Sequence, residues 1–114
     1  NKISTRIQAR VSGTFALAQC MAYPNPARTF SRIRCSFTGA NAVNITGQVT
    51  IVDVSGDEVT TLPLQSQGGG LYDAIWNLQN RQREIVGNGV YFAIIEAWGP
   101  DGDIKERRKI AVLR

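Results

Sequence analysis

The sequence contains no histidine, and it has only two cysteines, four prolines and an aromatic content of 8% over its 114 residues. The absence of histidine removes the commonest general base and the commonest metal ligand. Two cysteines without histidine are too few for a Cys/His metal site. No apolar run approaches the roughly 20 residues that a membrane-spanning helix needs. We therefore expect no enzyme, no cofactor and no membrane span.

What remains is a globular composition, with 43% hydrophobic and 19% charged residues, in a chain of the length of one domain. The sequence begins without methionine and without a basic and apolar leader. We expect it to be a processed or excised part of a longer protein.

Acidic residues are missing from the first 52 positions, which carry Lys2 and five arginines. A basic half would suit nucleic acid. However, the arginines alternate along predicted strands, where solvent-facing residues belong, and no aromatic residues interleave with them as a stacking platform requires. We expect no nucleic-acid binding.

The two cysteines, Cys20 and Cys35, close a short loop. An even pair in a chain of this size permits one disulfide, which would stabilise the fold by about 3 kcal/mol. Two buried free thiols are the alternative, because cysteine is among the most buried residue types.

Alternation with a period of two dominates the chain, and no helical period persists over three turns. The clearest case is the N-terminal segment, where Ile3, Ile7 and Val11 belong to the apolar set of a half-buried strand. We assign residues 1–16 to this strand, either as the end of a preceding domain or as an arm that pairs with another subunit.

Further strands are predicted at residues 30–37, 48–54, 58–62, 71–76, 90–98 and 104–113. In the first, the odd positions from Ser31 to Phe37 should face inward. Residues 48–54 are apolar enough to be covered on both faces, and Gly68–Gly70 marks a flexible connection. Turn signals every 8–12 residues or so between short strands predict an all-β, antiparallel sandwich of about seven strands plus the N-terminal one.

Several short motifs occur in a fixed order between residues 17 and 114. They are Tyr23-Pro24-Asn25-Pro26-Ala27, the strand Gln48–Asp53 with its turn through Val59, Trp76, Gly89-Val90-Tyr91-Phe92, and a basic final strand Arg107–Arg114. This series resembles the immunoglobulin-like module of the flagellar hook-capping protein and the C-terminal sorting domain of the type IX secretion system. The resemblance implies an immunoglobulin-like (fibronectin III-like) sandwich and an exported bacterial protein.

The residues that carry the resemblance have structural roles. Pro24 and Pro26 should fix an extended edge segment, with Asn25 capping the neighbouring turn. Asp53 should accept hydrogen bonds from amides of its own turn, where Gly56 supplies a positive φ. Tryptophan and tyrosine should fill the core between the sheets. These structural positions are Pro24, Asn25, Pro26, Asp53, Gly56, Trp76, Gly89 and Tyr91.

Two features near the C-terminus are weak site candidates. Asp101 and Asp103 flank Gly102 and would be calcium ligands, although aspartates in a hairpin are more often turn residues. Trp98 would be a platform for sugar stacking, or a strand-end residue packed on Pro100.

The resemblance implies a non-catalytic C-terminal module that sorts its parent for secretion or attaches it to the cell surface. Its partners would be the secretion machinery or neighbouring domains, and its recognition residues would be Lys105, Arg107, Arg108, Lys109 and Arg114. The second hypothesis is a subunit of an appendage, sheath or flagellar cap that forms a homo-polymer by strand addition through Ile3, Ile7 and Val11. A carbohydrate-binding accessory module is the third.

Overall fold

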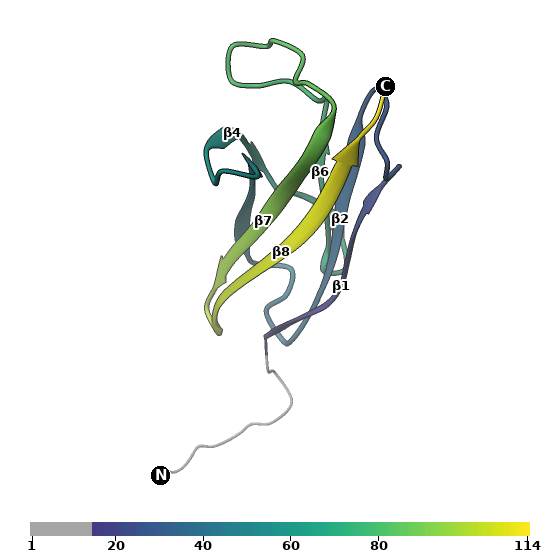
Figure 1. Ribbon diagram of the computed structural model, residues 1–114. Coiled ribbons are helices and arrows are strands. Elements are labelled where there is room, and N and C mark those ends of the chain that lie inside the picture. Colours follow the sequence, from purple (N-terminus) through teal and green to yellow (C-terminus); the bar gives the residue numbers. More distant parts are fainter. Residues whose placement is uncertain (1–14) are drawn as a thin grey trace.

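The computed structural model describes residues 15–114, which form β-strands and connecting turns (Figure 1). The strands are β1 (Ala16–Tyr23), β2 (Ser31–Thr38), β3 (Thr46–Asp53), β4 (Glu58–Pro63), β5 (Gln65–Gly68), β6 (Leu71–Trp76), β7 (Gly89–Gly99) and β8 (Gly102–Val112). Over these residues there is no helix long and apolar enough to cross a membrane.

The strands form two four-stranded antiparallel sheets, ordered β1-β2-β6-β5 and β4-β3-β7-β8. This is the immunoglobulin arrangement of strands ABED in one sheet and CFG, extended by C′, in the other. The predicted β-sandwich is therefore confirmed, with eight strands in the described part of the chain instead of about seven.

The core lies between the two sheets, where alternate residues of each strand meet. In β2 the odd positions from Ser31 to Phe37 are buried, as the alternation predicted. The inward-facing residues include Ile33, Cys35, Val49, Ile51, Trp76, Ala93, Ile95, Ile110 and Val112. Burial of these side chains provides the main driving force for folding.

Three local predictions need correction. β3 is buried on one face only, because Gln48, Thr50 and Val52 lie half-buried on the outer face of its sheet. Gly68–Gly70, predicted as a flexible connection, forms the hairpin turn between β5 and β6, with all three glycines at positive φ. Ala16, assigned to the N-terminal arm, is the first residue of β1 and pairs with Thr38.

The N-terminal prediction lies largely outside the described residues, as do its candidate contacts Ile3, Ile7 and Val11.

The segment after β1 connects the two sheets at one edge by pairing with β8. Ala27 donates to the carbonyl of Ala111 at 2.7 Å and accepts from Leu113 at 2.9 Å, forming a parallel bridge to β8. Asn25 does not cap the neighbouring turn as predicted, because its side-chain Nδ2 donates to the Lys109 carbonyl and its Oδ1 accepts from the Ala111 amide, each at 3.0 Å. The Pro24–Ala27 segment therefore extends the edge of β8.

Candidate functional site

Three of the five predicted basic residues lie together on the outer face of β8. Lys105, Arg107 and Lys109 are exposed and occupy alternate positions, so their side chains project from the same side of the strand. We call these three residues the basic row. No carboxylate pairs with them among the described ion pairs.

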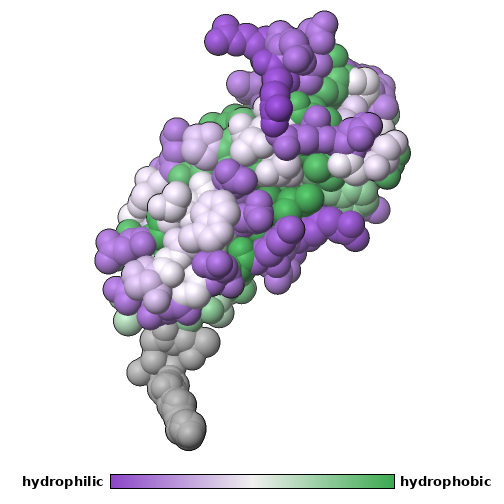
Figure 2. All heavy atoms as spheres, turned by 90° about the vertical axis from the view of Figure 1, so that its left-hand side faces the viewer, coloured by the Kyte–Doolittle hydropathy of each residue, from purple (hydrophilic) through white to green (hydrophobic). Residues whose placement is uncertain are grey.

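Two apolar side chains of β7 lie next to Arg107 and Lys109, and Glu96 lies opposite Lys105. The strand register places Phe92 opposite Lys109 and Ile94 opposite Arg107. The Arg107 guanidinium carbon lies 4.7 Å from the centre of the Phe92 ring, within the range of a cation–π contact. Figure 2 shows that green apolar patches alternate with polar residues on the side of the molecule that carries β4. Arginine beside aromatic and aliphatic residues is the composition that protein interfaces favour.

Arg108 and Arg114 donate hydrogen bonds to backbone carbonyls elsewhere in the fold, so they do not belong to the basic row. Arg108 points across the sandwich edge, and its Nε donates to the Cys20 carbonyl at 3.3 Å. The Arg114 guanidinium donates to the Val86 carbonyl, and its backbone amide donates to Asn88 Oδ1 at 3.0 Å. The predicted recognition set therefore divides into three outward-facing and two internally bonded residues.

Cys20 and Cys35 face each other directly across the β1–β2 ladder. Their sulfur atoms lie 3.0 Å apart as free thiols, with Cys35 buried and Cys20 half-buried. A hydrogen bond to Cys20 and burial raise the pKa of the Cys35 thiol. The hydrogen bond with Cys35, and the nearby Arg108 charge, lower the pKa of the Cys20 thiol. Cys20 is also the more exposed thiol of the pair.

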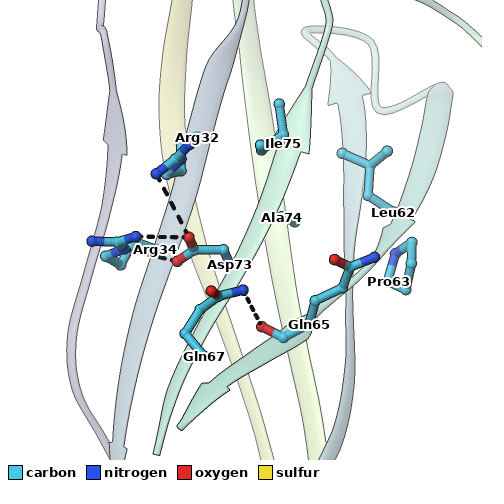
Figure 3. Close-up of a pocket in the computed structure, with 9 residues that line it drawn as sticks. All are labelled: Arg32, Arg34, Leu62, Pro63, Gln65, Gln67, Asp73, Ala74 and Ile75. Carbon is cyan, nitrogen blue, oxygen red and sulfur yellow. Dashed lines mark hydrogen bonds and ion pairs between the residues drawn. The ribbon is translucent and has the colours of Figure 1, made fainter.

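A pocket of about 430 Å³ opens on the other sheet, beside β5 (Figure 3). Asp73 of β6 forms a bidentate pair with Arg34 of β2, with both nitrogen–oxygen distances at 2.8 Å. Arg34 holds the pKa of the Asp73 carboxyl below its usual range. Arg32 lies farther away, with Nη1 at 3.9 Å from Asp73 Oδ2. No local pattern in the sequence predicts this pocket, whose residues come from β2, β4, β5 and β6.

The acidic turn before β8 is exposed. Asp101 accepts a 3.2 Å hydrogen bond from Asn41, and Asp103 pairs in register with Trp98. Within residues 15–114, no three histidine, cysteine or acidic side chains gather at one point. Trp98 is 39% exposed at the end of β7. These residues remain separate surface features.

The structural motif residues occupy defined places in the sandwich. Asp53 Oδ1 accepts from the amides of Ser55 and Asp57 at 2.9 and 3.0 Å, and Gly56 has a φ of 87° in that turn. Trp76 packs edge-on against Tyr91 with the ring centres 5.3 Å apart.

Trp76 Nε1 also donates to the Gln79 carbonyl at 3.0 Å, which fixes the start of the β6–β7 loop. Gly89 opens β7 opposite Val112 with a φ of 152°.

The sequence matches no protein-family model and no curated protein. Two solved structures from Porphyromonas gingivalis share the fold. Dimeric latent PorU matches with a TM-score of 0.75 and 22% identity, over 92% of this chain and 10% of its own. PorZ, an essential bacterial surface component of the type IX secretion system, matches with a TM-score of 0.51 and 20% identity, over 83% of this chain and 11% of its own.

At these identities the likeness shows a shared fold. The chain spans about a tenth of the length of each neighbour. This β-sandwich therefore also occurs as a small part of large bacterial proteins, one of which is a surface component of a secretion system.

Proposed function

We propose that this chain is a non-catalytic immunoglobulin-like module of an exported bacterial protein, which directs its parent to the type IX secretion machinery for delivery to the cell surface. The basic row of β8 carries the contact with the partner, which is a protein with an acidic surface.

The observation that carries this proposal is the position of Lys105, Arg107 and Lys109 on the exposed side of an edge strand. Two of these residues, Arg107 and Lys109, lie opposite the apolar side chains of Ile94 and Phe92. Charged groups that are free of internal partners steer association and select a partner of opposite charge. The fold shared with PorZ supports the choice of machinery.

Lysines on an edge strand also protect it from pairing with other strands. Charge of either sign would serve that protective role, whereas recognition of an acidic partner requires positive charge. Charge reversal therefore separates the two roles.

The test fuses the chain to the C-terminus of a periplasmic reporter in a bacterium that has a type IX system, and measures the reporter on the cell surface. Lys105→Glu combined with Lys109→Glu should lower surface reporter at least about tenfold, because an acidic partner would then be repelled. The matched control reverses Arg28 and Arg83, two exposed arginines outside the basic row, and should leave the amount unchanged.

Equal export of the two reversed variants, with both folded, would overturn the role of the basic row. A wild-type fusion that is folded and stays in the periplasm would overturn the proposed sorting function itself.

A second candidate function is a subunit of a surface assembly, which the alternation of Ile3, Ile7 and Val11 favours. In that case light scattering would give a polymer for the full chain and a monomer after deletion of residues 1–14. A monomer in both forms would exclude this candidate.

A further inference from the structure

The pocket beside β5 lies along an incompletely paired strand edge. β6 pairs with β5 only from Leu71 to Asp73, because β5 is four residues long. The remaining residues of β6, Ala74–Trp76, have no strand neighbour on that side within the described chain. Ala74 and Ile75 line the pocket instead, facing Leu62 and Pro63 of β4 (Figure 3).

The register shows which backbone groups of β6 face this edge. Phe37 donates to the Gly70 carbonyl at 2.9 Å, next to the register pair Ser36 and Leu71. Since hydrogen-bonded pairs alternate along an antiparallel ladder, Ala74 is bonded to β2 and Ile75 directs its N–H and C=O away from β2. Ile75 thus presents a donor and an acceptor to the pocket. Ile75 as a whole is 46% exposed, on the outer face of the sheet.

The same place carries an excess of positive charge. Arg32 and Arg34 share the single carboxylate of Asp73, and Arg34 forms both short bonds to it. The Arg32 side chain retains 34% exposure, and its buried Nε has no hydrogen-bond partner among the described residues. Arg32 lies opposite Ile75 in the register. A guanidinium whose charge is only partly compensated attracts a carboxylate.

We propose that this edge binds an extended peptide segment of a partner protein, with a glutamate side chain that pairs with Arg32. The peptide backbone adds a strand to β6 above β5, by exchanging hydrogen bonds with Ile75. The peptide residue opposite Ile75 would lie two strand spacings, about 10 Å, from the backbone of β2, which carries Arg32. Glutamate and arginine side chains together span that gap.

Charge argues against the chain's own N-terminus as the occupant. Residues 1–14 carry Lys2, Arg6 and Arg10 and no acidic residue. Such a segment would bring like charge to Arg32, which disfavours binding. The occupant is therefore an acidic segment from another protein, and this site is separate from the basic row of β8.

The test titrates the isotope-labelled full chain with a capped five-residue peptide of alternating valine and threonine around a central glutamate, followed by NMR. We expect saturable shifts of the Ile75 amide and the Arg32 guanidinium, with a Kd of about 1 mM. The same peptide with central glutamine should bind at least tenfold more weakly, because it lacks the charge. Arg32→Gln should cause the same loss, and the control Arg28→Gln should cause none.

A second pair of peptides tests the backbone contact without altering the protein. N-methylation of the central residue removes the N–H group that donates to Ile75 and should abolish binding. The N–H group of the following residue points away from β6, so N-methylation there should leave binding unchanged.

Three results would each overturn the proposal: no shift at Ile75 at about 10 mM peptide, equal affinity of the glutamate and glutamine peptides, or no effect of the central N-methyl group. None of these depends on export, so they leave the proposed sorting function standing.

Discussion

Asn25 pairs with the backbone amide of Ala111, 86 residues further along the chain, through a 3.0 Å hydrogen bond to its side-chain oxygen. Its amide nitrogen completes the contact at the carbonyl of Lys109. One side chain thus provides the donor and the acceptor that a backbone residue would provide at the edge of β8.

Replacing Asn25 by alanine should lower the free energy of unfolding by about 1–2 kcal/mol, because two hydrogen bonds are lost. Urea denaturation measures the change. Asn25→Asp keeps the acceptor for the Ala111 amide and loses the donor to the Lys109 carbonyl. We therefore expect its free energy of unfolding to lie between those of the wild type and the alanine variant. An alanine variant as stable as the wild type would show that Ala27 alone fastens this edge.

Oxidation should join Cys20 and Cys35. With oxidised glutathione, the Cys20 thiolate attacks one glutathione sulfur and releases the other as reduced glutathione. Cys35 then displaces the bound glutathione, and the protein becomes two hydrogens lighter by intact mass. The bridge should add about 3 kcal/mol of stability. Cys20→Ser should show no response to the oxidant, and an unchanged wild-type mass would contradict this expectation.

The pairing of Asp73 with Arg34 makes stability depend on pH. Because the folded pKa of Asp73 lies below its unfolded value of about 4, its contribution is fully present above that pH and is lost as the pH falls through the folded pKa. Asp73→Asn should therefore melt at a lower temperature than the wild type at pH 7. The difference should shrink in acid, and a difference that is constant over this range would mean that Asp73 acts by packing alone.

The hairpin glycines Gly69 and Gly70 differ in what surrounds them. A Cβ atom on Gly70 would lie 2.6 Å from the Phe37 carbonyl oxygen, whereas Gly69 has open space around it, and both have positive φ. Gly70→Ala should cost about 2–3 kcal/mol, combining strain with a backbone clash. Gly69→Ala should cost about 1 kcal/mol from φ alone. Equal losses in thermal unfolding would show that the Phe37 carbonyl moves aside.

Local pattern was enough to predict the parts of the fold whose partners are close in sequence. β6 coincides with its predicted range because Leu71–Trp76 is bounded by turns, and the Asp53 turn follows from bonds to residues two and four positions away. β5 was missed because Gln65-Ser66-Gln67-Gly68 is exposed on every residue and has no apolar face. It is a strand because its backbone pairs with β6.

The pocket and the division of the basic residues depend on long-range register. Asp73 meets Arg34 across 39 residues, and Arg108 meets the Cys20 carbonyl across 88. Neither separation leaves a local signal in the sequence. Alternation along residues 105–109 does separate Arg108 from its three basic neighbours, and this signal would have revealed the basic row.

The contact of Pro24–Ala27 with β8 also determines when the fold can be completed during synthesis. Asn25 and Ala27 bond to residues between Lys109 and Leu113, which are synthesised 84 to 86 residues later. Contacts between residues far apart in the sequence form late, because they require a large loop to close. This edge of the sandwich therefore stays open until residues 109–113 have been synthesised, and a nascent chain that stops before them lacks the strand that completes it.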